Sequence, residues 1–183
     1  MLTGKSITLG VTACSAVDKV PELIRRLRKL GAEVRVVMTP NATQFTTPLL
    51  LRHASGNPVS IDQFAGPEVW DKNHKPLAQA DLLLIAPASA DTLGKAANGL
   101  ADNLLTATLL SADCPIVFAT HINPKMYGKP SVQRNVTALK EDGYTFVEAH
   151  SAPFPSAMPT VDEIINTVLE VLVGRPHNTT LPQ

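Results

Sequence analysis

The sequence predicts a single α/β domain built on a Rossmann-like, doubly wound parallel sheet. Three observations predict this fold. Short apolar runs of strand length recur along the chain, amphipathic helical segments lie between them, and small or polar residues follow the runs. Apolar strands separated by helical crossovers are typical of a parallel sheet covered on both faces. A chain of 183 residues is long enough for one domain with one well-buried core.

The first half of the chain begins with two strand–helix units. Ile7–Val11 and Val34–Met38 are the first two expected strands. The helix between them has leucine and isoleucine on one face and basic residues on the other, and Gly31 suits its left-handed end. The expectations for the next segment are a helix over residues 42–53 interrupted near Pro48, a turn over 55–58 and an irregular stretch over 59–72.

The second half continues the alternation of strands and helices. Leu82–Ala86 reads as a strand buried on both faces, and Pro87 is expected to end it. Thr160 is expected to cap the last helix. The elements expected between these are a helix over Thr92–Ser111, a strand over Ile116–Thr120, a helix over Val132–Glu141, a strand over Thr145–Glu148 and a loop over Ser151–Pro159. Residues 1–175 form the expected domain and residues 176–183 an expected disordered tail.

Composition excludes several classes of function. A formal net charge of zero and a pI near 7.0 argue against broad electrostatic capture of nucleic acid or of an acidic membrane. The longest apolar runs fall far short of the about 20 residues that a membrane span needs, and the N-terminus lacks the features of a signal peptide. Cys14 and Cys114 fit no zinc spacing and are expected to be free thiols. We therefore expect a cytoplasmic protein with no metal site and no nucleic-acid or membrane partner.

The loops that follow the strands are the candidate binding elements, because ligands of parallel sheets lie at the carboxyl ends of the strands. The loop after Leu82–Ala86 is the most informative. Ala88, Ser89 and Ala90 allow a ligand to approach closely, and the helix start behind them offers unpaired N–H groups to a phosphate. The four loops expected to converge on one edge of the sheet are Ala13–Ala16, Thr39–Asn41, Pro87–Thr92 and Thr120–Met126.

The residues alone leave the chemistry of these loops open. No Walker A or dinucleotide fingerprint is present. Ser15 and Thr39 suit either a phosphate or ribityl contact, or a plain turn and a helix cap. His121 and Asn123 follow a strand end directly, whereas His74 lies in a non-periodic stretch that could fold over the site. A lone histidine is more often structural than catalytic, so the residues predict a cofactor-binding domain of unsettled chemistry.

Three blocks of sequence go beyond this generic pattern. They read GVTACSAVDKVPELIRRLRKLGAEVRVVMTPNATQF, IAPASADTLGKAANGLADNLLTATLLS and INPKMYGKPSVQRNVTALKEDGY. In order and spacing they resemble the homo-oligomeric flavin-containing cysteine decarboxylases of the flavoprotein superfamily, which include phosphopantothenoylcysteine decarboxylases and peptidyl-cysteine decarboxylases. The resemblance covers roughly Ser6–Val147. It implies FMN as cofactor and assembly as a homotrimer or homododecamer.

The resemblance also implies roles for individual residues. Asn123 would hydrogen-bond the substrate carboxylate, His74 would act as base or orienter near the thiol, and His121 is the alternate base. The implied cofactor contacts are Cys14 and Ser15 in the first loop, Thr39 and Phe45 in the second, Pro87, Ala88, Ser89, Ala90, Asp91 and Thr92 at the family's PASANT motif, and Met126.

The chain departs from the family pattern at several positions. Asp91 replaces the amide of PASANT with a carboxylate, which cannot donate a hydrogen bond when ionised. In the family's PxMNxxMW motif, Thr120, Ile122 and Tyr127 stand for the proline, the first methionine and the tryptophan. The segment after His74 is one residue shorter than usual, so this side chain need not point into the site.

The C-terminal region predicts the substrate. Phosphopantothenoylcysteine decarboxylases reduce their enethiol with a cysteine of a C-terminal clamp, whereas this chain has no cysteine after Cys114, including in His150–Pro159. An enzyme without that reductant is expected to stop at the enethiol. The resemblance therefore implies oxidative decarboxylation of the C-terminal cysteine of a precursor peptide to an aminoenethiol. The alternatives are a phosphopantothenoylcysteine decarboxylase of coenzyme A biosynthesis, a flavin prenyltransferase and a non-catalytic regulatory flavoprotein subunit.

Overall fold

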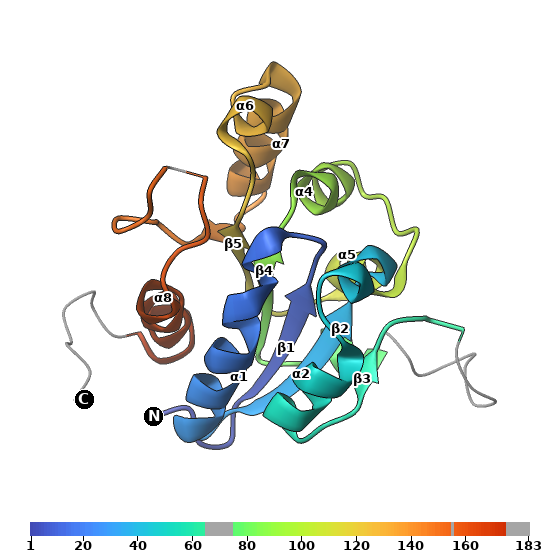
Figure 1. Cartoon of the computed structure of the whole chain (residues 1–183), viewed down its shortest axis with the longest axis vertical. Coiled ribbons are helices and arrows are strands. Elements are labelled where there is room, and N and C mark those ends of the chain that lie inside the picture. Colours follow the sequence, from blue (N-terminus) through green and yellow to red (C-terminus); the bar gives the residue numbers. More distant parts are fainter. Residues whose placement is uncertain (65–74, 155, 175–183) are drawn as a thin grey trace.

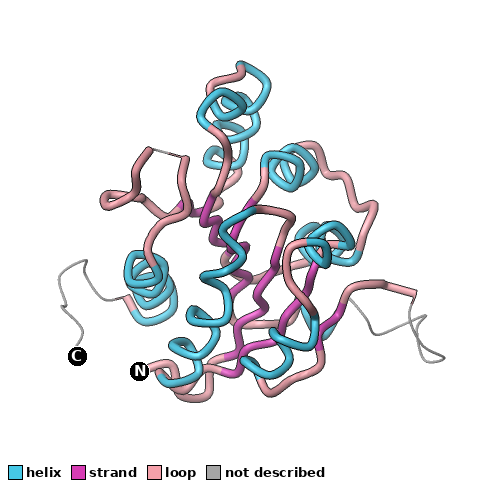
Figure 2. Tube along the Cα trace, viewed as in Figure 1, coloured by secondary structure: helices cyan, strands magenta, loops and turns pink. Residues whose placement is uncertain are grey.

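A six-stranded parallel sheet in the order β3-β2-β1-β4-β5-β6 forms the centre of the molecule (Figures 1 and 2). This is the doubly wound order in which winding reverses between β1 and β4. The predicted fold class is confirmed. The computed structural model describes residues 1–64, 75–154 and 156–174. The strands are β1 (Ser6–Val11), β2 (Glu33–Met38), β3 (Val59–Ser60), β4 (Leu82–Ala88), β5 (Ile116–Thr120) and β6 (Thr145–Phe146).

Helices cover both faces of this sheet, which separates the core into two clusters. Helices α1, α2 and α8 pack on one face, and α3, α4, α5 and α7 on the other (Figure 2). The helices are η1 (Ser15–Lys19), α1 (Val20–Lys29), η2 (Pro40–Gln44), α2 (Pro48–Ser55), α3 (Lys75–Ala78), α4 (Ala90–Ala97), α5 (Leu104–Ser111), α6 (Pro124–Tyr127), α7 (Pro130–Glu141) and α8 (Val161–Val173).

Strand β4 is apolar throughout because both of its faces are buried under helices. Leu82 and Leu84 belong to the cluster under α1 and α8, whereas Leu83 and Ile85 belong to the cluster under α5 and α7. Both sets are fully buried, as expected for a central strand with no solvent face. At Gly10 of β1, an added Cβ would lie 2.6 Å from side-chain atoms of Ile85 and of Leu105 in α5. Glycine at this position therefore lets α5 approach the sheet.

The expected end of this strand at Pro87 is wrong. Strand β4 continues through a cis Ala86–Pro87 peptide to Ala88. The pairing of β4 with β5 shifts register between Ile85 and Ala88. Proline is tolerated at such an irregularity because the ladder is already interrupted where its missing N–H would be needed.

The single helix expected over Thr92–Ser111 is also wrong. The segment forms two helices, α4 and α5, separated by residues 98–103. Gly99 adopts the left-handed conformation with φ of 64°, and Asn103 begins α5 through a capping box with Thr106. A favourable cap and a left-handed glycine outweigh the continuous helical pattern.

The remaining differences concern short elements. The stretch expected to be irregular contains β3, although residues 65–72 lie outside the described part, as do residues 176–183 of the expected tail. The last strand ends at Phe146 rather than Glu148, and η1 begins at Ser15 within the first expected loop. The cap at Thr160 is confirmed, since Thr160 and Glu163 form a capping box at the start of α8.

Candidate functional site

The carboxyl ends of β1, β2, β4 and β5 lie at one edge of the sheet, near η1, α4 and α6 at the top of Figure 1. Hydrogen bonds join these ends directly. The Thr39 N–H donates to the Val11 carbonyl oxygen over 3.0 Å, and the His121 N–H donates to the Ala88 carbonyl oxygen over 3.0 Å. The four predicted loops therefore start from one connected edge, as parallel strands require.

Thr12, at the end of β1, holds the first and third loops together. Its hydroxyl donates to the Pro87 carbonyl oxygen over 2.7 Å and accepts the Ser89 N–H over 3.0 Å. The side chain is 1% exposed. Sequence reasoning missed this residue, although a threonine at the end of an otherwise apolar strand is a signal that could have been used.

Thr39, at the end of β2, carries a buried polar atom that needs a partner. The residue is 8% exposed, and its Oγ1 has no hydrogen-bond partner within the described part of the chain. Leaving a buried hydroxyl unpaired is unfavourable, so native proteins usually satisfy such groups. A polar atom of a ligand at this edge would satisfy it. The side chain makes no cap hydrogen bond to η2, so the helix-cap interpretation of Thr39 is wrong, whereas a ligand contact stays a prediction.

The loop between β4 and α4 combines a helix cap with a potential anion site. Ser89 Oγ accepts the Thr92 N–H over 3.3 Å and lies 3.1 Å from Thr92 Oγ1. These two hydroxyls therefore belong to the cap. The N–H groups of Ala90 and Asp91 belong to the first turn of α4, where no intrahelical acceptor exists, and such groups bind phosphate oxygens.

Asp91 is part of a small network of charges at this helix start. Its carboxylate lies 3.2 Å from Lys95 Nζ, which also lies 2.9 Å from an Asp102 oxygen. Hydrogen bonding to Asp102, and secondarily to Asp91, raises the pKa of Lys95. The ammonium group therefore offsets the negative charge that Asp91 brings to a motif in which the family has an amide.

His121 lies just beyond β5 and connects the first loop to the segment before α8. Its Nε2 is 3.0 Å from Ser15 Oγ, and its Nδ1 accepts the Met158 N–H over 3.1 Å. Burial, and then the charge of Lys19, lowers the pKa of this imidazole. The Cys14 thiol donates to the His121 carbonyl oxygen over 3.5 Å, and burial raises the pKa of that thiol. The thiol also lies 3.6 Å from Thr12 Oγ1, so both of its contacts are with residues of the same edge.

The segment that precedes α8 is tied to the same edge by a second pair of hydrogen bonds. Ser156 Oγ donates to the Ile122 carbonyl oxygen over 2.7 Å, and the Ile122 N–H donates to the Ser156 carbonyl oxygen over 2.8 Å. Sequence reasoning missed Ser156 and Met158, because nothing in a proline-rich stretch indicates which residue a distant strand end will contact.

The remaining predicted residues are placed as follows. Asn123 Oδ1 accepts the Lys125 N–H over 2.9 Å and caps α6, which leaves its amide N–H groups to face other partners. Phe45 and Met126 are each 53% exposed, so their apolar surfaces are available to a planar ligand. His74 lies outside the described residues.

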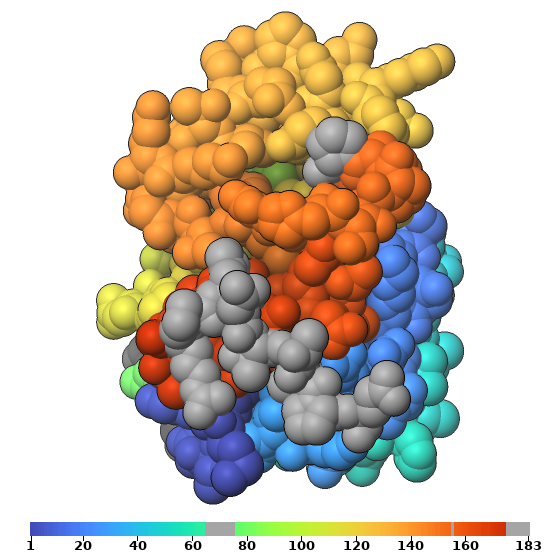
Figure 3. Space-filling view, turned by 90° about the vertical axis from the view of Figure 1, so that its left-hand side faces the viewer, coloured from blue at the N-terminus to red at the C-terminus, as the bar shows by residue number. Residues whose placement is uncertain are grey.

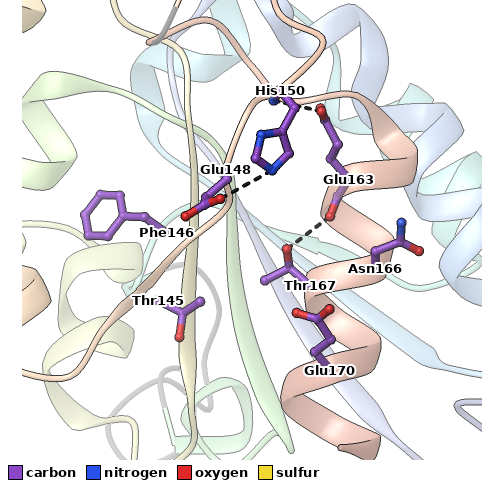
Figure 4. Close-up of a pocket in the computed structure, with 8 residues that line it drawn as sticks. All are labelled: Thr145, Phe146, Glu148, His150, Glu163, Asn166, Thr167 and Glu170. Atoms are coloured by element: carbon purple, nitrogen blue, oxygen red, sulfur yellow. Dashed lines mark hydrogen bonds and ion pairs between the residues drawn. The ribbon is translucent and has the colours of Figure 1, made fainter. Parts of the chain in front are cut away.

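Two hollows lie next to β6 and share Phe146, Glu148 and His150. A groove of about 660 Å³ runs from Thr120 and Tyr127 to the stretch between β6 and α8, and Figure 3 shows that stretch crossing the face below α6 and α7. A smaller cavity of about 290 Å³ lies between β6 and α8 and contains Glu148, Glu163 and Glu170 (Figure 4). None of the residues lining the smaller cavity belongs to the four strand-end loops.

Neither a membrane span nor a metal cluster is found in the described ranges. No helix there is long and apolar enough to cross a bilayer. Within the same ranges, no three histidine, cysteine or acidic side chains lie together in a way that could hold a metal ion.

Comparison with known proteins identifies relatives along most of the chain. The model of the Flavoprotein family matches residues 1–173. A probable phosphopantothenoylcysteine decarboxylase of Streptococcus mutans is 39% identical over 177 residues, which cover 92% of this chain and 99% of that protein. The coenzyme A biosynthesis bifunctional protein CoaBC of Bacillus subtilis is 40% identical over 149 residues. These are 81% of this chain but 37% of that protein, so the chain spans well under half of its bifunctional relatives.

Solved structures agree with the sequence relatives. The FMN-dependent cysteine decarboxylase SpaF matches with a TM-score of 0.84 and 36% identity, covering 95% of this chain and 98% of that one. A PPC decarboxylase mutant complexed with pantothenoylaminoethenethiol matches with a TM-score of 0.76 and 30% identity over 90% of this chain and 96% of that one. The peptidyl-cysteine decarboxylase EpiD matches with a TM-score of 0.76 and 26% identity over 90% and 98%. Because the family model matches residues 1–173 and the fold agrees with the solved structures, the chain belongs to the Flavoprotein family.

Proposed function

We propose that the chain oxidatively decarboxylates the C-terminal cysteine of a precursor peptide and releases an aminoenethiol. FMN-dependent cysteine decarboxylation is the activity named for the solved structures of SpaF and TvaF, which are 36% and 32% identical to this chain. The cofactor of the family is a flavin, and the relatives identify it as FMN. The relatives include both PPC decarboxylases and peptidyl-cysteine decarboxylases, so the choice of a peptide as substrate needs a separate argument.

The strand-end residues suit FMN. The unpaired Thr39 hydroxyl, the exposed Ser15 hydroxyl and the first N–H groups of α4 would hold the phosphate and ribityl oxygens. The half-exposed Phe45 and Met126 would contact the ring system. This distribution of polar and apolar groups around one sheet edge is the physical basis for assigning the cofactor to it.

FMN, when bound, supplies two-electron oxidation of the cysteine side chain to a thioaldehyde, through which the carboxylate can leave as carbon dioxide. The protein's own residues orient the substrate. The amide N–H groups of Asn123 are free of the α6 cap and would donate to the substrate carboxylate. His74 is the proposed base or orienter near the thiol. Thr12 keeps the first and third loops at a fixed separation, so the cofactor and substrate that these loops would bind keep a fixed relative position.

The observation that carries the choice of a peptide is the absence of cysteine from residues 115–183. Reduction of an enethiol to a thiol needs a two-electron donor, and the stretch before α8 has no thiol to provide one. The reaction would therefore stop at the enethiol. The groove that begins at Thr120 has room for residues that precede the terminal cysteine.

A second candidate is phosphopantothenoylcysteine decarboxylase. The Streptococcus mutans relative favours it, because that protein matches this chain over 99% of its own length. The two candidates differ in the substrate and in the fate of the enethiol, so one assay separates them.

The assay is mass spectrometry after incubation of the flavin-loaded protein with a peptide ending in cysteine and with 4′-phosphopantothenoylcysteine. We expect the peptide to lose carbon dioxide and two hydrogens, and a peptide ending in cysteine amide to stay unchanged because it has no carboxylate. Loss of carbon dioxide alone from phosphopantothenoylcysteine, with no change in the peptide, would instead establish the second candidate.

The same proposal includes assembly and location. Large apolar side chains are exposed around α2 and α5 and are suited to contacts between copies of the chain. We propose a homotrimer or a homododecamer, which light scattering on the purified protein tests directly. Free cysteines and relatives in coenzyme A biosynthesis support a cytoplasmic location. The exposed side chains are Phe45, Leu49, Leu50, Leu100 and Leu110.

A further inference from the structure

His121 makes side-chain hydrogen bonds to two segments that are distant in sequence, and neither bond is used by the reaction described above. One bond goes to Ser15 in the first loop and the other to Met158 before α8. We propose that His121 is a positioning residue, a neutral imidazole that directs the Ser15 hydroxyl proton toward the phosphate of bound FMN. The proposal rests on the proposed binding of FMN at this edge, but not on which cysteine compound is the substrate.

The hydrogen bond from Met158 determines the tautomer of the ring. A backbone N–H can only donate, so Nδ1 of His121 must present a lone pair to it. In a neutral imidazole the proton then lies on Nε2. Nδ1 therefore accepts from Met158 and Nε2 carries the proton that faces Ser15. For His121 to act as a base, the bond from Met158 would have to break.

The tautomer in turn determines how the Ser15 hydroxyl is used. Nε2–H donates to Ser15 Oγ over 3.0 Å, so this oxygen is occupied as an acceptor and its own proton is left to donate. Ser15 is exposed at the strand-end edge, where a ligand can reach it. Successive bonds from Met158 to His121 and from His121 to Ser15 polarise each other and strengthen the last donor. Such a donor suits an anionic acceptor such as a phosphate oxygen.

The arrangement also links the cofactor to the segment before α8. If the phosphate strengthens the bond between Ser15 and His121, it also favours the bond between His121 and Met158. Met158 lies two residues after Ser156, which is itself held by Ile122. The effects must be reciprocal, because a coupling free energy between two sites acts in both directions.

Two amide substitutions separate the two bonds of the ring. Asparagine places an acceptor oxygen near the position of Nδ1, so His121→Asn keeps a partner for Met158 and loses Ser15. Glutamine places an N–H donor near the position of Nε2, so His121→Gln keeps the partner of Ser15 and loses Met158. His53→Asn, at an exposed position in α2, is the matched control.

The measurement is the affinity of each protein for FMN and for riboflavin, by fluorescence titration after flavin removal. We expect both His121→Asn and Ser15→Ala to bind FMN about tenfold more weakly than the wild type, with the affinity for riboflavin unchanged. The double variant is expected to match Ser15→Ala alone, because both substitutions remove one interaction. We expect His121→Gln to retain FMN affinity within about twofold and to raise KM for the substrate with little change in kcat.

Three results would overturn the inference. These are an unchanged FMN affinity in His121→Asn, an equal loss of FMN and riboflavin affinity in that variant, and additive losses in the double variant. Circular dichroism of each variant comes first, and if His121→Asn does not fold, loss of FMN affinity in folded His121→Gln contradicts the inference on its own. Failure of the wild type to bind FMN would overturn the proposed function as well, whereas a wild type that binds FMN but decarboxylates neither substrate would contradict only the proposed reaction.

Discussion

The hydroxyl of Thr12 donates to the carbonyl oxygen of Pro87 across 2.7 Å and thereby joins the ends of β1 and β4. Because the same oxygen accepts the Ser89 N–H, one buried side chain binds two backbone groups at the end of β4 and the start of the following loop. The loop that precedes α4 is thus fixed by a residue 75 positions earlier in the chain.

Replacing Thr12 with the isosteric valine removes both hydrogen bonds without changing the packed volume. We expect Thr12→Val to lower the free energy of unfolding by about 2 kcal/mol, because a buried carbonyl and a partly buried N–H lose their partner. FMN affinity is also expected to fall. Thr8→Val is the control, since it removes a buried hydroxyl that donates to the Leu77 carbonyl oxygen. Urea unfolding and FMN titration of both variants test this, and an equal effect on FMN affinity would contradict the role of Thr12.

Thr39→Val is expected to act with the opposite sign on stability. The Thr39 hydroxyl is buried without a partner, so its removal is expected to leave the flavin-free protein as stable as the wild type or up to about 1 kcal/mol more stable. Affinity for FMN is expected to decrease about tenfold if this hydroxyl contacts the cofactor. Urea unfolding of the flavin-free protein combined with FMN titration gives both values. A variant that is clearly destabilised without flavin would refute this account of Thr39.

Lys95→Gln leaves the carboxylates of Asp91 and Asp102 without their shared ammonium group. We expect FMN affinity to fall roughly fivefold at low salt and less at high salt, because Asp91 lies at the helix start proposed to bind the phosphate and its charge is exposed and screened. Adding Asp91→Asn to this variant is expected to restore the affinity. If the double variant binds as weakly as Lys95→Gln, charge compensation is not the function of this lysine.

The His121 pKa predicts how FMN binding depends on pH. Burial, and then the Lys19 charge, holds the pKa of His121 below its ordinary 6.5, while Asp18 of η1 opposes this shift. The neutral ring is therefore favoured by the fold, its contribution is complete above pH 6.5, and it is lost as pH falls through the folded value. We expect the wild type to lose more FMN affinity between pH 7.5 and 5.5 than His121→Asn does. The comparison is needed because the phosphate of FMN also titrates near pH 6, as phosphate monoesters do.

Asp81 gives a second pH dependence, at the opposite end of the sheet from the site. The Ser6 N–H, then Lys5 and the Ser6 hydroxyl, lower the pKa of this carboxyl from 3.8 to about 2. Its charged form stabilises the fold above pH 3.8, and this contribution is lost as pH falls toward 2. We expect the unfolding free energy of Asp81→Asn to decline less steeply than that of the wild type between about pH 5 and pH 2.

Much of this fold is accessible from the sequence because its signals are local. Apolar runs identify β1, β2, β4 and β5, and the turn that ends α1 follows from Gly31 with φ of 97°. The break between α4 and α5 was also readable, since Gly99 and Asn103 are turn and cap residues. The hydrophobic pattern alone predicts one continuous helix over Thr92–Ser111, and these two residues are what interrupt it.

The detailed contacts of the site are not accessible in the same way. Ser15 and Met158 are 106 and 37 residues from His121, and no periodicity relates them. The continuation of β4 past Pro87 depends on its register with β5, which is a property of the assembled sheet. The sequence does indicate that the four strand-end loops lie at one edge of the sheet. The hydrogen-bond partners of His121 and Ser15, however, depend on tertiary packing.

The two outermost strands of the sheet, β3 and β6, have only two residues each. An edge strand this short offers few free backbone N–H and C=O groups to another chain. A strand of a second molecule therefore has little to pair with at either edge of the sheet, which disfavours growth into fibrils. A protein of this design can expose apolar side chains on its helices for ordered assembly while its sheet resists uncontrolled aggregation.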